Sequence, residues 1–231
     1  RHPAAIAQTL ATLDVLSGGN LIIGVGEGST ESDFLALGIP FQERRKMLED
    51  GVPALRALLS GENVSHHGPY YDFDNVTVAP RGLQQPCVPI WLSSWGSPAG
   101  MRRVARLGDG WVSSGWHSTP EEFNEALNNL DTALKNRGKD PGSFPNAVNT
   151  IFMYIDEDGD QARSVAVPII EQTIQAKFET QGGHFLVGSY QECQDLLRRW
   201  MAAGAKEICL WPVTDAVTQV QRFGQFLLPG L

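Results

Sequence analysis

Residues 88–114 read VPIWLSSWGSPAGMRRVARLGDGWVSS, and this stretch decides the fold class. It begins with a short apolar run at 88–92, which is typical of a strand that is buried on both faces. Ser97 then suits the N-cap of a helix, and Pro98 suits its first position. A Gly-Asp-Gly turn leads into a second strand at 111–114. Strand, helix and strand in this order predict a parallel pair with a right-handed crossover.

The same alternation extends in both directions along the chain. Short apolar runs at 21–25, 147–155 and 208–211 predict three more strands. Periodic apolar residues predict the helices, including a first one that carries Ile6, Leu10, Leu13 and Leu16. We therefore expect a single α/β domain over residues 1–231 with five barrel-type strands, each followed by a helix, and a hairpin excursion at about 62–75. This pattern fits an open doubly wound sheet or a closed barrel, and periodicity alone does not decide between them.

The charge balance bears on the class of partner. The net charge is −8 and no block of Lys or Arg occurs, which argues against nucleic acid and anionic membranes because phosphate neutralisation needs clustered cations. A small-molecule substrate is the better expectation. The three cysteines lack Cys-x-x-Cys spacing and predict neither a disulfide framework nor a zinc site, which fits a reducing cytoplasm.

The ends of the sequence also matter. The chain opens on Arg1-His2-Pro3 without an initiator Met, so we expect that the natural protein starts upstream. No apolar run approaches the roughly 20 residues that span a bilayer, and the N-terminus has no signal-peptide pattern. We expect a cytoplasmic protein.

Several motifs together resemble the bacterial luciferase-like family of flavin- and deazaflavin-dependent oxidoreductases. The matching segments cover almost the whole chain: Arg1-His2-Pro3, Leu13-Asp14, Leu16-Ser17-Gly18, the run from Leu21 to Gly26, Leu37-Gly38, Phe41, Glu43-Arg44, Val88 to Trp91, Asp109-Gly110-Trp111, Leu186 to Ser189, and Leu228-Pro229. The resemblance implies a (β/α)₈ (TIM) barrel whose first three strands are missing from this chain, and a homodimer. The family usually has Arg where Asn20 stands and often Trp where Ser29 stands, so the substrate stays open.

The clearest local chemistry lies in the segment Ser93-Ser94-Trp95-Gly96-Ser97, which runs from a strand end to a helix N-terminus. Unpaired N–H groups and the helix dipole attract an anion there, although Ser97 as a mere N-cap and Gly96 as a mere turn explain the same residues. The resemblance implies that a coenzyme phosphate binds in this place. Ser113 and Ser114 end the next strand and are candidates for further hydroxyl donors, or else solvated loop serines.

A second candidate is the loop Gly24-Val25-Gly26-Glu27. It lacks the third glycine of a dinucleotide-binding loop, so we reject that fold. In related deazaflavin-dependent sugar-phosphate dehydrogenases a similar loop lies beside the coenzyme ring, and the resemblance implies that role for Gly24, Val25 and Gly26. Glu27 is a candidate general acid if burial raises its pKa, and a solvated carboxylate otherwise.

Three histidines complete the candidates. His117 follows the strand at 111–114 and is a candidate for substrate contact or proton donation, although a lone loop histidine is more often a surface residue. His66 and His67 are adjacent on a predicted strand, so they point to opposite faces and no third ligand has suitable spacing. We expect no metal.

These observations rank the functions. Monooxygenation with reduced FMN and O₂ on a small organic substrate comes first, with a separate flavin or deazaflavin reductase as a possible partner. Hydride transfer by a deazaflavin coenzyme (factor 420) comes second. A non-catalytic flavin-binding relative and a phosphate-binding barrel that acts on sugar phosphates are the alternatives.

Overall fold

The computed structural model describes residues 2–178 and 184–231. Its first elements are α1 (Pro3–Leu16), β1 (Ile23–Val25), α2 (Glu31–Ala36), the 3₁₀ turn η1 (Phe41–Glu43), α3 (Arg44–Ser60), β2 (Val64–His67), β3 (Asp72–Val76), β4 (Ile90–Ser93) and α4 (Pro98–Leu107). There follow β5 (Gly110–Ser114), α5 (Pro120–Lys135), β6 (Asn146–Asp156), α6 (Gly159–Ile174), β7 (Leu186–Ser189), α7 (Tyr190–Ala202), β8 (Glu207–Pro212), α8 (Ala216–Arg222), the π turn η4 (Phe223–Leu227) and the 3₁₀ turn η5 (Leu228–Gly230).

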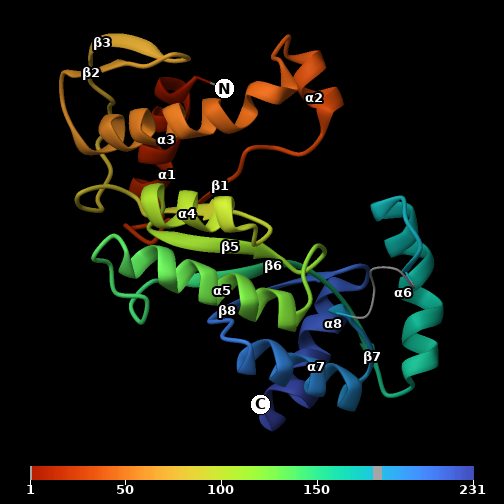
Figure 1. Cartoon of the computed structure of the whole chain (residues 1–231). Coiled ribbons are helices and arrows are strands. Elements are labelled where there is room, and N and C mark those ends of the chain that lie inside the picture. The colour runs from red at the N-terminus through yellow and green to blue at the C-terminus, as the bar shows by residue number, and fades with distance from the viewer. Residues whose placement is uncertain (1, 179–183) are drawn as a thin grey trace. The chain divides into compact units, whose positions relative to one another are not determined.

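The chain divides into two compact units. Unit 1 comprises Arg1–Ser93 and Arg106–Gly110, and unit 2 comprises Ser94–Ala105 and Trp111–Leu231. In unit 1, β1 pairs in parallel with β4, with Ile23 opposite Ile90. The strands β2 and β3 form an antiparallel hairpin that lies beside α3 (Figure 1).

The hairpin is attached to α3 by one carboxylate. Asp50 of α3 accepts hydrogen bonds from the backbone N–H groups of Tyr70 and Tyr71 and lies 2.8 Å from His66 Nε2. Burial alone would raise the pKa of Asp50, but the hydrogen bonds from His66, Tyr70 and Tyr71 outweigh burial and lower it. Asp50 therefore fixes the position of Tyr71, which matters for the cavity described below.

The buried face of α1 differs from the prediction. The apolar stripe leads us to expect Leu13 and Leu16 in the core, but both are exposed, and the buried residues are Pro3, Ala7, Ala11 and Asp14. Helix α1 packs against α3, and small alanines let two helices approach closely. The Asp14 carboxylate is buried because it accepts hydrogen bonds from Gln84 and from the Leu83 N–H.

Unit 2 is built on parallel strands. Trp111 of β5 lies opposite Asn146 of β6, while β7 and β8 also pair in parallel with β6. Helix α5 begins with a capping box between Thr119 and Glu122, in which each side chain accepts a hydrogen bond from the backbone N–H of the other residue. Its Phe123 is buried and stacks on Trp111 at 4.7 Å between ring centroids.

The predicted alternation of parallel strands with helices is confirmed. The prediction does not count β7, because its four residues include Gly188 and the cap residue Ser189, and such a segment gives a weak strand signal. Helix α2 is also not predicted. Its six residues are too few for apolar periodicity to appear.

Candidate functional site

The loop 94–97 of unit 2 connects a sheet to a helix. The Ser94 N–H donates to the Val112 carbonyl at 3.1 Å, so the loop starts as a continuation of the sheet. Gly96 has φ of +94°, and a Cβ there would lie 2.8 Å from Ala126 Cβ, so the loop packs directly on α5. The Ser97 hydroxyl accepts the Gly100 N–H at 3.2 Å, as expected of a residue that caps α4.

A glycine in the first turn of α4 makes room for two hydroxyl groups. A Cβ on Gly100 would lie 2.2 Å from Ser94 Oγ and 3.0 Å from Ser97 Oγ. Because non-bonded atoms do not approach to 2.2 Å, only glycine leaves the Ser94 hydroxyl in this place. Both predicted serines therefore lie at the N-terminus of the same helix.

The side chains of Ser113 and Ser114 point to opposite sides of β5, because successive residues of a strand alternate. Ser113 shares its side with Trp111, whose Nε1–H donates to the Ser94 carbonyl at 3.0 Å. Ser113 is 1% exposed, and its hydroxyl has no hydrogen-bond partner among the described residues. Ser113 thus lies on the side of β5 from which Trp111 reaches the Ser94 carbonyl, whereas Ser114 lies on the opposite side.

We call Ser94, Ser97, Ser113 and the N-terminus of α4 the serine cradle. Buried hydroxyl groups normally have a partner, so the Ser113 hydroxyl leaves one donor to be satisfied. The helix N-terminus adds partial positive charge. This donor set fits a phosphate group, and the residues present are therefore compatible with a phosphate-bearing coenzyme.

Ser114 and His117 form a second group in unit 2. The His117 Nδ1 lies 3.1 Å from Ser114 Oγ. Trp95, which is 56% exposed, stacks on the imidazole with ring centroids 4.0 Å apart. The sequence predicts Trp95 as a coenzyme contact and His117 as a catalytic residue, and the structure brings the two side chains together.

The electrostatics of His117 favour its neutral form. Burial and, secondarily, the charge of His184 lower the pKa of His117. Burial also lowers the pKa of His184, although its hydrogen bond to the Trp116 carbonyl opposes this. At neutral pH an imidazole of this kind is better suited to accept a proton than to donate one.

In unit 1, the predicted residues of the first loop follow the end of β1. Gly24 and Val25 lie in the strand, opposite Trp91 and Leu92 of β4. Gly26 comes next, and a Cβ there would lie 3.4 Å from Ser93 Cβ. Ser93 is exposed at the end of β4. The role of these residues beside a coenzyme ring stays a prediction.

Glu27 forms ion pairs with Arg44 and Arg45, which the sequence does not predict. The Arg45 Nε lies 3.2 Å from both carboxylate oxygens, and the Arg44 Nε lies 4.0 Å from Oε1. Arg44 and Arg45 follow Glu27 by 17 and 18 residues in the chain. A contact over that separation leaves no signal in the sequence. The structure thus places Glu27 in an ion pair, and its role as an acid stays a prediction.

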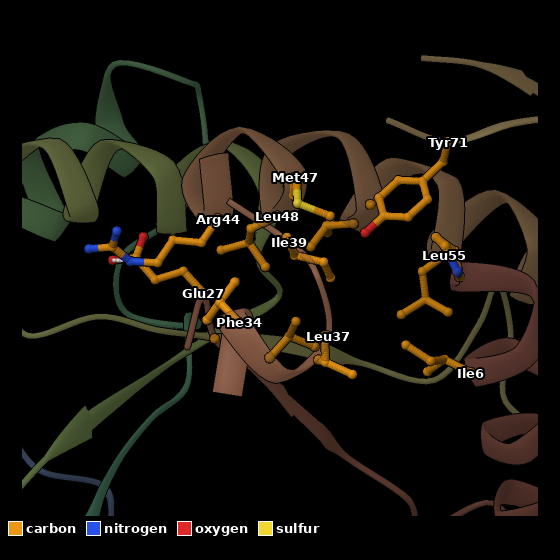
Figure 2. Close-up of a pocket in the computed structure, with 15 residues that line it drawn as sticks. Ile6, Glu27, Phe34, Leu37, Ile39, Arg44, Met47, Leu48, Leu55 and Tyr71 are labelled. Atoms are coloured by element: carbon orange, nitrogen blue, oxygen red, sulfur yellow. Dashed lines mark ion pairs between the residues drawn. The ribbon is translucent and has the colours of Figure 1, made fainter. Parts of the chain in front are cut away.

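A cavity of about 240 Å³ lies beside Glu27 within unit 1 (Figure 2). Helices α1 and α3 and the segment 34–39 contribute most of its lining. The apolar lining residues are Pro3, Ile6, Val25, Phe34, Leu37, Ile39, Met47, Leu48, Val52 and Leu55. Sequence reasoning missed this cavity, because an apolar stripe such as Leu48, Val52 and Leu55 usually indicates packing.

The two adjacent histidines of the hairpin bind carboxylates. His66 contacts Asp50, whereas His67 Nδ1 lies 2.7 Å from Asp72 and Nε2 lies 3.4 Å from Asp74. They point to opposite faces, as strand alternation requires. Over residues 2–178 and 184–231, no three His, Cys, Asp or Glu side chains form a group that could hold a metal ion. In the same part of the chain, no helix is long and apolar enough to cross a membrane.

Comparisons with known proteins identify the family. A model described as luciferase-like monooxygenase matches residues 1–207. The 5,10-methylenetetrahydromethanopterin reductase of Archaeoglobus fulgidus is 30% identical over 164 residues, which are 71% of this chain and 47% of that protein. The F420-dependent glucose-6-phosphate dehydrogenase of Kineococcus radiotolerans is 32% identical over 164 residues, 70% of this chain and 47% of that protein. The chain thus spans about half the length of the curated relatives it matches.

Solved structures agree with this assignment. The monooxygenase RslO1 from Streptomyces bottropensis has a TM-score of 0.84 and 27% identity, and the match covers 99% of this chain and 74% of that chain. An F420-dependent secondary alcohol dehydrogenase in complex with an F420-acetone adduct has a TM-score of 0.83 at 21% identity, with the same coverage, and shares the fold. The parallel α/β fold thus matches luciferase-like TIM-barrel structures over 74% of their length. The chain belongs to the luciferase-like monooxygenase family, which comprises flavin- and F420-dependent oxidoreductases.

Proposed function

We propose that this chain is part of an oxidoreductase that binds a phosphate-bearing reduced flavin or deazaflavin coenzyme, with the phosphate in the serine cradle. One observation carries the proposal: the buried Ser113 hydroxyl has no partner among the described residues and shares a side of β5 with Trp111, whose Nε1–H donates to the Ser94 carbonyl. A phosphate oxygen would accept a hydrogen bond from it.

Hydride transfer with a deazaflavin coenzyme is our leading candidate, although the sequence alone ranks FMN monooxygenation first. A sequence relative at 32% identity is an F420-dependent dehydrogenase. The lowered pKa of His117 agrees with this choice, because a dehydrogenase needs a group that accepts the proton of an alcohol. When bound, the reduced coenzyme supplies the hydride, and its oxidised form accepts one.

The protein's own residues have three tasks in this proposal. The serine cradle binds and orients the phosphate through hydroxyl donors and the dipole of α4. In this proposal the His117 Nδ1–H donates to the Ser114 hydroxyl oxygen, so that Nε2 is the atom that accepts a proton. Trp95 covers one face of that imidazole and fixes the plane of its ring.

FMN-dependent monooxygenation is the second candidate. It is supported by the likeness to the monooxygenase RslO1, which extends over 99% of this chain at 27% identity. A monooxygenase of this type would receive its reduced coenzyme from a separate reductase. In that case His117 would not be needed as a proton acceptor for an alcohol.

An anaerobic titration distinguishes the candidates. The full chain is titrated with reduced FMN and with the reduced deazaflavin coenzyme, and O₂ is then admitted. Tighter binding of the deazaflavin without any reaction with O₂ supports hydride transfer. Tight binding of FMN followed by a transient oxygen-dependent absorbance change moves the assignment to monooxygenation. If neither coenzyme binds, the proposal is wrong.

Variants test whether the coenzyme occupies the serine cradle. Ser113→Ala removes the unpartnered hydroxyl and should weaken coenzyme binding about tenfold, which is typical for the loss of one hydrogen bond to a charged group. Ser164→Ala is the matched control, because Ser164 is an exposed serine of α6 whose hydroxyl donates to the Gln161 carbonyl of the same helix. Equal affinities of the two variants would contradict the placement of the phosphate.

A further inference from the structure

The cavity of unit 1 has an apolar body and two polar ends. Ten apolar side chains line it, while Glu27 and Arg44 lie at one end and Tyr71 lies at the other (Figure 2). An engineered apolar cavity of about 150 Å³ in another protein binds benzene, which has six non-hydrogen atoms. In proportion to its volume of about 240 Å³, the cavity of unit 1 has room for about ten non-hydrogen atoms.

The Arg44 end is closed by a charged pair. The side chain of Arg44 is 19% exposed; its guanidinium lies over the Phe41 ring, and Nη1 donates to the Phe41 carbonyl at 2.9 Å. The Nε atom lies 4.0 Å from Glu27 Oε1 and is buried, so a molecule in the cavity has no access to it. A ligand would therefore find its hydrogen-bond donor at the other end of the cavity.

The Tyr71 end is held in place by the hairpin. The Tyr71 N–H donates to Asp50 at 3.0 Å, and the phenol hydroxyl points toward the other lining side chains (Figure 2). Burial, and then the charge of Asp50, raises the pKa of Tyr71, so this hydroxyl keeps its proton and can donate a hydrogen bond.

We propose that this cavity is a binding site for a small, uncharged, mainly apolar molecule that carries one acceptor oxygen, such as an aryl or cycloalkyl ketone. Its apolar body would displace water from the leucine and isoleucine side chains, and its oxygen would accept a hydrogen bond from the Tyr71 hydroxyl. A doubly charged sugar phosphate does not fit this lining, because burying an anion among apolar side chains costs far more than the one donor returns. The inference goes beyond the coenzyme assignment. Val25 and Gly26 line the cavity and are also predicted beside the coenzyme ring, so the test is made without coenzyme.

The test uses ligand pairs of matched size in the absence of coenzyme. Acetophenone and isopropylbenzene differ mainly in the carbonyl oxygen, and glucose 6-phosphate is the charged comparison. Binding is measured by calorimetry and by saturation-transfer NMR. We expect acetophenone to bind about fivefold more tightly than isopropylbenzene, as one hydrogen bond from a neutral donor predicts. We expect no competition by glucose 6-phosphate.

Two neighbouring leucines provide a matched pair of variants. Leu37 lines the cavity and is 69% exposed, whereas Leu35 is 74% exposed and does not line it. Leu37→Trp should therefore weaken acetophenone binding at least tenfold by filling space, while Leu35→Trp leaves it unchanged. Tyr71→Phe keeps the ring but removes the hydroxyl, and it should reduce acetophenone to the affinity of isopropylbenzene.

Every other result overturns the inference. Absence of acetophenone binding, equal binding of acetophenone and isopropylbenzene, or equal effects of the two tryptophan variants would each contradict it. Melting temperatures of the variants near that of the unchanged chain show that folding is retained. Because no coenzyme is present, failure here leaves the coenzyme titration to be judged on its own.

Discussion

The hydroxyl of Ser94 lies where the side chain of residue 100 would begin. A Cβ on Gly100 would be 2.2 Å from Ser94 Oγ, so the first turn of α4 accommodates this hydroxyl only because residue 100 is glycine. The relationship connects the loop 94–97 to the helix whose N-terminus forms the serine cradle. It also allows the cradle to be altered without removal of any polar group.

Gly100→Ala should therefore displace the Ser94 hydroxyl and weaken coenzyme binding about tenfold, the effect of losing one hydrogen bond to an anion. Alanine otherwise favours a helix over glycine by about 1 kcal/mol, so a lower melting temperature would report the steric clash directly. The double variant Ser94→Gly with Gly100→Ala removes the clash and should regain the melting temperature without regaining affinity. Full affinity in the double variant would contradict the role of Ser94.

Trp111 and Phe123 allow stability and binding to be separated. Trp111→Phe keeps a ring against Phe123 but loses the Nε1–H that donates to the Ser94 carbonyl, so coenzyme affinity should fall severalfold and stability by about 1 kcal/mol. Phe123→Leu keeps that donor but loses the stacked ring, so stability should fall by about 1–2 kcal/mol with affinity retained. Urea denaturation and coenzyme titration measure both quantities. Parallel losses of affinity in the two variants would show that the hydrogen bond to Ser94 has no specific role.

His117 should titrate below an ordinary histidine. Burial and the charge of His184 lower the pKa of His117 below 6.5, and NMR titration of the imidazole protons measures it. His184→Gln should raise the pKa of His117, because a neighbouring positive charge is lost. As the pH falls below 6.5 the unfolded chain takes up protons first, so the stability contributed by the neutral imidazole is present above 6.5 and is lost progressively below it.

The catalytic role of His117 has a separate test. His117→Gln should reduce the rate of hydride transfer about 100-fold or more, the range for loss of an acid-base group, and should leave coenzyme affinity unchanged. The control is His67→Gln, since His67 is an exposed residue of the hairpin that contacts Asp72 and Asp74. An unaltered rate in His117→Gln would remove this residue from the mechanism.

Asp14 should contribute stability that depends on pH. Burial raises its pKa, but hydrogen bonds from the backbone and side chain of Gln84 and from the Leu83 N–H outweigh burial and lower it below 3.8. Its contribution is therefore present above pH 3.8 and is lost as the pH falls through the folded-state pKa. Asp14→Asn should cost about 1–3 kcal/mol at pH 7, and the difference should narrow near pH 3.

Urea denaturation at the two pH values checks this prediction. Asp33→Asn in α2 is the control, because Asp33 is exposed. A cost of Asp14→Asn that is the same at both pH values would show that the ionised carboxylate is not what these donors stabilise.

The fold was predictable where a signal is local. The apolar run at 88–92, the Ser97-Pro98 pair and the Thr119–Glu122 capping box each depend on neighbouring residues, and the structure has a strand or a helix start at each. The buried face of α1 was not predictable, because it depends on how closely α3 approaches Ala7 and Ala11.

The candidate site was predictable only in part, because some of its contacts join residues that are far apart in the sequence. Ser94 and Ser97 follow from the position of a helix start, but the need for glycine at residue 100 depends on a contact that only the folded loop makes. The different surroundings of Ser113 and Ser114 follow from strand alternation once β5 is placed. The pairing of Glu27 with Arg45 spans 18 residues and has no local signal.

The most direct test of the coenzyme assignment compares each coenzyme with its phosphate-free counterpart. Riboflavin is titrated against FMN, and the deazaflavin nucleoside against the intact deazaflavin coenzyme, with the unchanged chain and with Ser113→Ala. If the serine cradle binds the phosphate, one of the phosphate-bearing coenzymes should bind about 100-fold more tightly than its counterpart, as several charge-assisted hydrogen bonds predict, and Ser113→Ala should reduce that ratio about tenfold. Equal affinities with and without the phosphate would contradict the account.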